Sequence, residues 1–153
     1  MKAKTIALTI SLFFASVAMG FQNNPQMGTW KLNETKSKLA GKAKNHTVVY
    51  EAAGDQIKVT VDGVDENGAA VHNEWTGKFD GKDYPVTGDA NSDVRSYRMI
   101  NKNTLSLTGK KDGKETLSGR VVVSSDGKTR TVTTTTTNAQ GKKVMNTAVY
   151  DKQ

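Results

Sequence analysis

Hydrophobic and polar residues alternate along most of this chain, in short runs that turn residues separate. Ile57, Val59 and Val61, for example, alternate with Lys58 and Thr60. A period of two places successive side chains on opposite faces, so each run predicts a half-buried β-strand. The predicted strands are 27–33, 47–50, 57–62, 71–79, 84–86, 94–100, 105–108, 117–123, 129–137 and 144–150.

The pattern predicts an all-β protein, because no segment carries an apolar stripe at helical spacing. About ten short strands at this spacing are typical of a β-sandwich or a β-barrel. Asn67-Gly68 is a strong hairpin signal. We predict a single antiparallel up-and-down β-barrel, because closing the sheet hides its edges. The strand around Trp30 should pair with the last strand, near residues 146–152. Residues 34–45 should form a loop with at most one helical turn.

The first 20 residues have the layout of a secretory signal peptide. Two lysines precede a largely apolar segment from residue 5 to 17, and small residues follow it, with possible cleavage after Gly20 or after Ala18. The apolar run is shorter than the roughly 20 residues that cross a bilayer. We therefore expect residues 1–20 to be removed, residues 21–153 to form one domain without a membrane span, and the protein to be periplasmic or secreted.

Composition narrows the possible functions of the mature chain. The 153 residues include no cysteine, so disulfides and thiolate metal sites are excluded. The net charge is +7, and it falls to +5 without Lys2 and Lys4 of the predicted signal. A basic exported domain could favour anionic surfaces such as lipid headgroups or acidic polysaccharide, although such a charge also serves solubility. The lysines lie on turns without interleaved aromatic residues, so we expect no nucleic-acid binding. We expect a monomer.

Both ends of the predicted domain resemble the calycin superfamily. The residues concerned are Gly28-Thr29-Trp30-Lys31-Leu32 near the start and Val149-Tyr150-Asp151-Lys152 at the end. Within that superfamily the chain is most similar to fatty-acid-binding proteins and bacterial lipocalin-like domains, and it also looks like a group of small exported bacterial proteins. The resemblance implies that Gly28 and Trp30 close the barrel, with the indole plugging its floor.

The chain departs from the fatty-acid-binding proteins at two points. Those proteins hold a ligand carboxylate with an Arg-x-Tyr pair on the last strand. Here Tyr150 matches the tyrosine, but Ala148 stands at the position of the arginine. The segment 34–45 is also too short for their two-helix lid. The resemblance therefore implies the barrel but not this carboxylate clamp.

The candidate ligand-binding residues are aromatic or cationic. They are Trp75, Tyr84, Arg95, Tyr97, Arg98 and Tyr150. Aromatic rings and a cation could line a cavity and meet an anionic group. Strand alternation places Arg95 and Arg98 on opposite faces, so one of them should point inward and need a carboxylate or a ligand as partner. The sequence leaves open which of the two it is.

Signals for catalysis and for cofactors are missing from the sequence. His46 and His72 are the only histidines, and zinc sites usually need three or four ligands, so we expect no metal site. There is no phosphate loop and no nucleophile elbow. We expect no cofactor and no enzymatic activity, since no nucleophile and base can be paired.

These observations predict an exported lipocalin-like protein that binds a small apolar or amphipathic ligand non-covalently in a barrel cavity. The alternative is a structural or interaction module of the bacterial cell envelope, with a filled barrel and no ligand.

Overall fold

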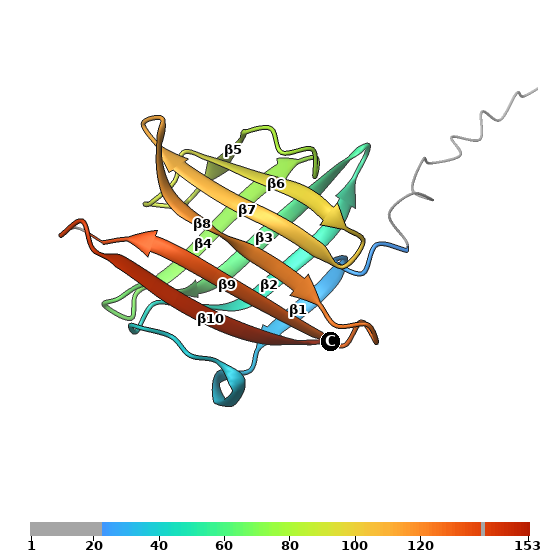
Figure 1. Cartoon of the computed structure of the whole chain (residues 1–153), viewed down its shortest axis with the longest axis horizontal. Helices are drawn as coiled ribbons and strands as arrows, with labels where there is room; N and C mark the ends of the chain where they lie inside the picture. Colours follow the sequence, from blue (N-terminus) through green and yellow to red (C-terminus); the bar gives the residue numbers. More distant parts are fainter. Residues whose placement is uncertain (1–22, 139) are drawn as a thin grey trace, which may run out of the picture.

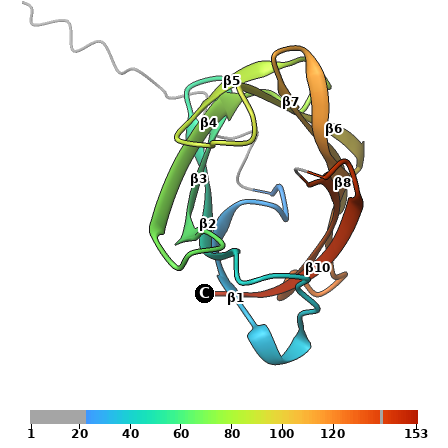
Figure 2. The same cartoon turned by 90° about the vertical axis from the view of Figure 1, so that its left-hand side faces the viewer.

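The computed structural model describes residues 23–138 and 140–153, and it forms a closed antiparallel β-barrel. Ten strands follow one another around the ring in chain order, and β1 closes it between β2 and β10. Figure 1 shows the barrel from the side, and Figure 2 shows the ring of strands end-on. The predicted all-β, up-and-down barrel is therefore confirmed. The predicted signal peptide lies outside the described residues.

The elements match the predicted order but several strands are longer. They are β1 Gly28–Leu32, a 3-10 turn η2 Glu34–Lys36, β2 Lys44–Ala53, β3 Gln56–Val64, β4 Ala70–Gly77, β5 Tyr84–Thr87, β6 Val94–Asn101, β7 Thr104–Lys111, β8 Lys114–Val123, β9 Thr129–Thr137 and β10 Lys143–Lys152. The strand expected at 47–50 spans ten residues. The residues at both ends of β2 also pair with β3. They lack the apolar–polar alternation from which the strand was predicted, so the sequence pattern missed them.

Strands β1 and β10 close the barrel in the predicted way. Trp30 lies opposite Lys152, and Leu32 lies opposite Tyr150. Beyond Leu32 the chain leaves the sheet but stays beside β10: the Asn33 amide donates to the Val149 carbonyl (2.8 Å), and Lys38 pairs with Thr147. The loop thus continues the barrel wall where β1 stops.

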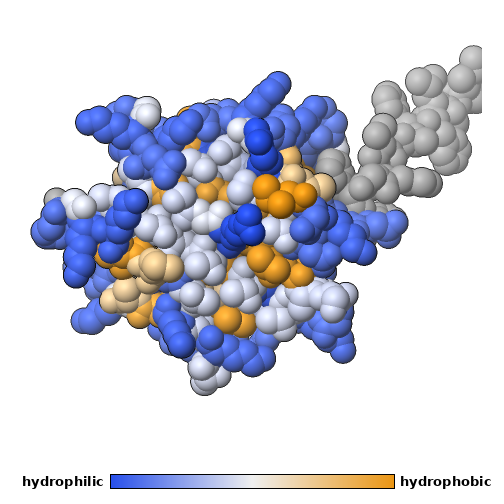
Figure 3. All heavy atoms as spheres, in the orientation of Figure 1, coloured by the Kyte–Doolittle hydropathy of each residue, from blue (hydrophilic) through white to orange (hydrophobic). Residues whose placement is uncertain are grey.

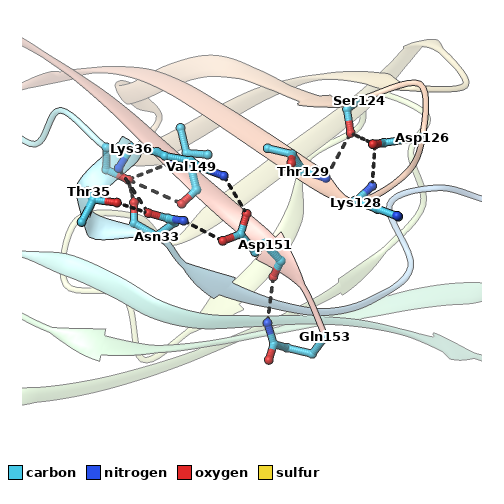
Figure 4. Close-up of polar contacts among 11 residues, drawn as sticks. Asn33, Thr35, Lys36, Ser124, Asp126, Lys128, Thr129, Val149, Asp151 and Gln153 are labelled. Carbon is cyan, nitrogen blue, oxygen red and sulfur yellow. Dashed lines mark hydrogen bonds and ion pairs between the residues drawn. The ribbon is translucent and has the colours of Figure 1, made fainter.

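Side chains also fasten this loop to the last strand (Figure 4). Asn33 Nδ2 donates to a carboxylate oxygen of Asp151 (2.7 Å), and Lys36 Nζ lies 3.6 Å from the other oxygen. The Ser37 hydroxyl accepts a hydrogen bond from the Val149 amide (2.9 Å). One 3-10 turn is the whole helical content between β1 and β2, which agrees with the expectation that no two-helix lid is present.

The two ends of the barrel differ. We call the end where β1 starts and β10 finishes the closed end, because residues 23–27 pass inside the ring there (Figure 2). Gln26 is fully buried, and its side-chain amide donates to the Asn103 carbonyl (3.1 Å). The Trp30 indole N–H donates to the Gln26 carbonyl (2.9 Å). Trp30 and the N-terminal segment thus plug this end. We call the opposite end, which holds the β3–β4, β5–β6 and β7–β8 turns, the open end.

Apolar side chains on the inward faces form one core. Its buried members are Trp30, Val48, Tyr50, Ile57, Val59, Val61, Trp75, Val86, Tyr97, Leu105, Leu107, Val121, Val123 and Tyr150. The strand β9 carries threonines on both of its faces. Its inward face holds Val132, Thr134 and Thr136, and the threonines between them point outward. Gly28 has a φ of 110°, a conformation that suits glycine, and its missing Cβ leaves room for Lys152.

Candidate ligand site in the barrel

Aromatic side chains fill the closed half of the barrel. Trp75 and Tyr97 pack edge to face with ring centres 4.8 Å apart, and Phe79 stacks on Trp75 at 6.4 Å. The Trp75 indole N–H donates to the Arg95 carbonyl (2.8 Å), so this buried polar group is satisfied. These rings form a rigid floor beneath the open half of the barrel.

A buried arginine stands in this floor and was not among the candidates from the sequence. Arg130 on β9 is 3% exposed. Its guanidinium carbon lies 4.6 Å from the ring centre of Tyr50, 5.5 Å from that of Tyr150 and 5.9 Å from that of Trp30. Nη2 donates a hydrogen bond of 2.6 Å to the Tyr50 hydroxyl. Cation–π attraction to three rings holds the guanidinium in place.

The charge of Arg130 is not matched by an acid within the described part of the chain. No carboxylate there lies within ion-pairing distance of it, and its Nε and Nη1 have no hydrogen-bond partner. Burial raises the pKa of the Tyr50 and Tyr150 hydroxyls, and the opposing effect of Arg130 is smaller. Both phenols are therefore neutral at pH 7 and do not act as counter-ions. A bound anion would supply the missing negative charge and would accept hydrogen bonds from Nε and Nη1 of Arg130.

Arg95 is the inward-pointing member of the pair that the sequence left open, and it has a partner from its own chain. Its Nη2 lies 2.8 Å from a carboxylate oxygen of Asp89, and Nη1 donates to Asn73 Oδ1 (3.3 Å). The side chains of Arg95 and Asp89 are only 8% and 15% exposed. Asp89 belongs to the β5–β6 loop, so this ion pair draws the loop onto the open end.

The wall formed by β8, β9 and β10 is less buried than the opposite wall. The inward positions on these strands are small or medium-sized, and they are half-buried toward the open end: Leu117, Gly119, Val132, Thr134, Thr136, Val144, Asn146 and Ala148. These inward positions therefore keep some contact with solvent. Val132 and Ala148 lie directly above Arg130 and Tyr150 on their strands, so this wall leads down to the arginine.

Two hollows lie at the margins of the barrel. One of about 280 Å³, at the closed end, is lined mainly by Ile57, Phe79 and Met99. The other, of about 470 Å³, is broad and polar, and it lies beside the β1–β2 loop at Leu39, Lys42 and Lys44. Neither hollow includes Arg95 or Arg130.

The structure brings together only some of the predicted site residues. Trp75, Arg95, Tyr97 and Tyr150 are buried in the interior. Tyr84 is half-buried: its ring packs edge to face on Trp75 with ring centres 5.7 Å apart, and its hydroxyl donates to Asp80 (2.8 Å). Arg98 is exposed on the outer face of β6, so it does not line the interior. The ligand-binding role of all six residues stays a prediction.

Arg130 could have been found only from the register of β9. Arg130 and Val132 are two residues apart, so they lie on the same face of the strand, and the apolar Val132 indicates that this face points inward. Threonines occupy both faces of β9, however, so the sequence pattern does not show which face is buried. Its neighbour across the sheet is Tyr150. Tyr150 on the last strand therefore contacts an arginine. This arginine is Arg130 of the adjacent strand β9, and not a residue at position 148 as in the fatty-acid-binding proteins.

Two further features bear on the site. Among residues 23–138 and 140–153, no group of three or more His, Asp or Glu side chains could hold a metal ion. The described part of the chain also has no helix of the length and apolarity needed to cross a membrane.

Comparisons with known proteins do not assign this chain to a family. No protein-family model matches the sequence, and no characterised protein matches it significantly. Among solved structures, a redesigned β-barrel, mFAP1, bound to DFHBI is similar, with a TM-score of 0.48 and 12% sequence identity over 84% of this chain and 95% of that chain. A similarity at this level carries no argument about function. The calycin family therefore stays a prediction, whereas the ten-strand barrel is observed.

Proposed function

We propose that this protein binds a small amphipathic anion inside the open half of the barrel, with the anionic group at Arg130. The apolar part of the ligand would lie against Leu117, Val132 and Ala148. The barrel is then a cup, with an aromatic floor and a wall of small residues. Export to the periplasm or the medium, expected from residues 1–20, belongs to the same proposal.

One observation carries this proposal: a buried arginine with unpaired N–H groups lies beneath an inward wall that solvent reaches. A buried cation without a carboxylate is costly, and the cation–π contacts offset only part of that cost. A ligand carboxylate or phosphate would accept the free N–H groups of Arg130 in a charge-assisted pair. The neutral Tyr150 hydroxyl could donate to the same group.

Native mass spectrometry of the purified protein, followed by extraction and identification of any bound molecule, is the direct test. We expect a small anionic amphiphile, and we expect added fatty acids or related amphiphiles to bind in competition with it. Arg130→Met should abolish this binding, because methionine fills similar space without the charge. Arg120→Met is the matched control, since Arg120 on β8 faces outward and is exposed.

A second variant keeps the test decisive if the Arg130 variant folds poorly. Ala148→Phe leaves Arg130 intact but places a large ring in the wall above it, so we expect binding to be lost while the barrel stays folded. Unchanged binding in both variants would reject the site. If the protein carries no ligand and binds none of the anions, the filled aromatic half favours the alternative, an interaction module of the cell envelope.

A further inference from the structure

Hydroxyl groups dominate the outer face of β7, β8 and β9. The outward positions near the middle of this face include Ser106, Ser118, Arg120, Thr131, Thr133 and Thr135. No hydrogen bond from these five hydroxyl groups to another group of the described chain is present, so they are available to an outside partner. Figure 3 shows this side of the barrel, where weakly polar residues cover much of the middle, with hydrophobic patches and a few strongly hydrophilic side chains among them, and hydrophilic residues gather around the margin.

Cations are placed at intervals across this hydroxyl-rich face. Strand register puts Arg98, Ser106, Arg120, Thr133 and Thr147 in one row across β6 to β10, and the row ends on Lys38. Neighbouring strands lie about 4.8 Å apart, so Arg98 and Arg120 are separated by about 10 Å at the backbone. Both arginines and Lys38 are exposed.

Within the described residues the cations of this row have no ion-pair partner, unlike those on the opposite side of the barrel. On the outer face of β3 and β4, Lys58 pairs with Glu74 and His72 pairs with Asp62. Arg98, Arg120 and Lys38 form no ion pair with any residue in the described ranges. The nearest acid in the row is Asp80 beside Arg98, and its carboxylate already accepts hydrogen bonds from Lys82 and Tyr84.

We propose that the row Arg98–Arg120–Lys38, with the surrounding serines and threonines, is a docking surface for a linear acidic polysaccharide of the uronic-acid type. The arginines would hold carboxylates of the polymer through paired hydrogen bonds, and the Ser and Thr hydroxyls would bond to its sugar hydroxyls. This surface lies outside the barrel and does not depend on the proposed ligand in its interior.

The chemistry of the face favours this partner over other anionic polymers. Single-stranded nucleic acids are bound largely by stacking bases on aromatic rings, and duplex DNA by inserting a helix or a ribbon into a groove. The aromatic residues of β6 and β10, Tyr97 and Tyr150, point into the barrel. The row therefore offers charge and hydroxyl groups but no ring to stack on. Each contact is weak, so binding should depend on engaging several of them along the polymer.

Affinity electrophoresis and titration calorimetry with polygalacturonate test the proposal, with neutral dextran as the reference polymer. We expect the protein to bind polygalacturonate and not dextran, and the binding to weaken as salt is added. Arg98→Met together with Arg120→Met should lower the affinity at least about tenfold, because two charge-assisted contacts are lost. Arg98→Lys with Arg120→Lys should lower it less, since the charge remains but the paired geometry does not.

The matched control is Lys102→Met with Lys142→Met, which removes the same net charge from exposed turns away from the row. Equal weakening by the control pair would mean that only net charge matters, and it would overturn the proposal. Binding to dextran as tight as to polygalacturonate would overturn it as well. So would preferential binding to single-stranded DNA or to anionic phospholipid vesicles, the latter through the exposed Ile100 and Val122. Arg130→Met should leave polysaccharide binding unchanged, which separates this proposal from the interior site.

Discussion

Arg130 and Tyr50 are joined twice: Nη2 of the arginine donates a 2.6 Å hydrogen bond to the phenol oxygen, and the guanidinium carbon lies 4.6 Å from the ring centre. The two residues come from β9 and β2, on different parts of the ring. This contact therefore ties the walls of the barrel together through its floor. Among the residues that the structure describes, the arginine is left with free N–H groups and without an acid, which is the basis of the proposed function.

The energetic role of Arg130 can be separated from its proposed role in binding. We expect Arg130→Met to leave the free energy of unfolding unchanged or to raise it, because an uncompensated buried charge is replaced by apolar volume. Arg130→Ala should lower it by about 2–4 kcal/mol, since it leaves a cavity among three rings. Urea denaturation measures both. A loss with methionine as large as the loss with alanine would show that the cation itself, and not the filled volume, holds the floor together.

The buried ion pair at the β5–β6 loop should contribute strongly to stability. Asp89→Asn leaves Arg95 buried without an anion, and breaking a buried pair in this way costs about 3 kcal/mol or more. Urea or thermal unfolding should show this loss. The control is Asp83→Asn, which removes the partner of Lys110 from an exposed ion pair, and its effect should be small. Similar losses from the two variants would contradict the assignment of Arg95 and Asp89 as a structural pair.

Trp30 should be the single most sensitive apolar position of the closed end. Trp30→Ala empties a fully buried site and should lower the free energy of unfolding by about 3–5 kcal/mol. Trp30→Phe keeps most of the packing but leaves the Gln26 carbonyl without its donor, so a smaller loss is expected. Thermal unfolding followed by circular dichroism compares the two. If Trp30→Ala unfolds no earlier than Trp30→Phe, the indole does not plug the barrel.

The pH dependence of His72 follows from its neighbours on the outer face of β3 and β4. Hydrogen bonds to Asp62 (2.6 Å from Nδ1) and then to Glu74 raise the pKa of His72. A raised pKa means that the charged form is favoured in the folded state. The resulting stabilisation is fully present below the histidine pKa of the unfolded chain, near 6.5, and it is lost as pH rises through the folded-state pKa.

An NMR titration of the His72 ring checks this pH dependence directly. Asp62→Asn should lower the pKa of His72, because the stronger of the two hydrogen bonds then lacks its negative charge. Asp55→Asn, on the β2–β3 turn, is the control and should leave that pKa unchanged. A His72 that titrates at the same pH in all three proteins would show that the Asp62 contact is not formed in solution.

Processing of the N-terminus is open to a simple test. If residues 1–20 form a cleaved signal, protein secreted by a bacterial host should begin at Phe21, or at Met19 if cleavage follows Ala18. N-terminal sequencing or intact-mass measurement of protein from the periplasm and the medium gives the answer. Gly20→Lys and Ala18→Lys together should block cleavage, because signal peptidase sites need small residues. Unprocessed, cytosolic wild-type protein would contradict the predicted export.

The period-two alternation by itself determined the fold class of this protein, because a half-buried strand must place apolar side chains on one face. Ile57, Val59 and Val61 were predicted to share that face, and all three are in the core. The turn signal at Asn67-Gly68 and the stretch Gly28-Thr29-Trp30-Lys31-Leu32 likewise located a hairpin and the first strand. These features are local, so they can be read without knowing which strands are neighbours.

The interior chemistry was decided only by the tertiary structure. Whether Arg95 or Arg98 points inward depends on the phase of β6 relative to the rest of the ring, and the choice of Asp89 as partner depends on how the β5–β6 loop folds over the open end. Arg130 meets Tyr50, Tyr150 and Trp30 only because closure of the barrel brings four strands together around one point. These contacts join residues 20 to 100 positions apart in the sequence. They arise from strand register and barrel closure and not from local preference, so the hydrophobic pattern along the chain does not predict them.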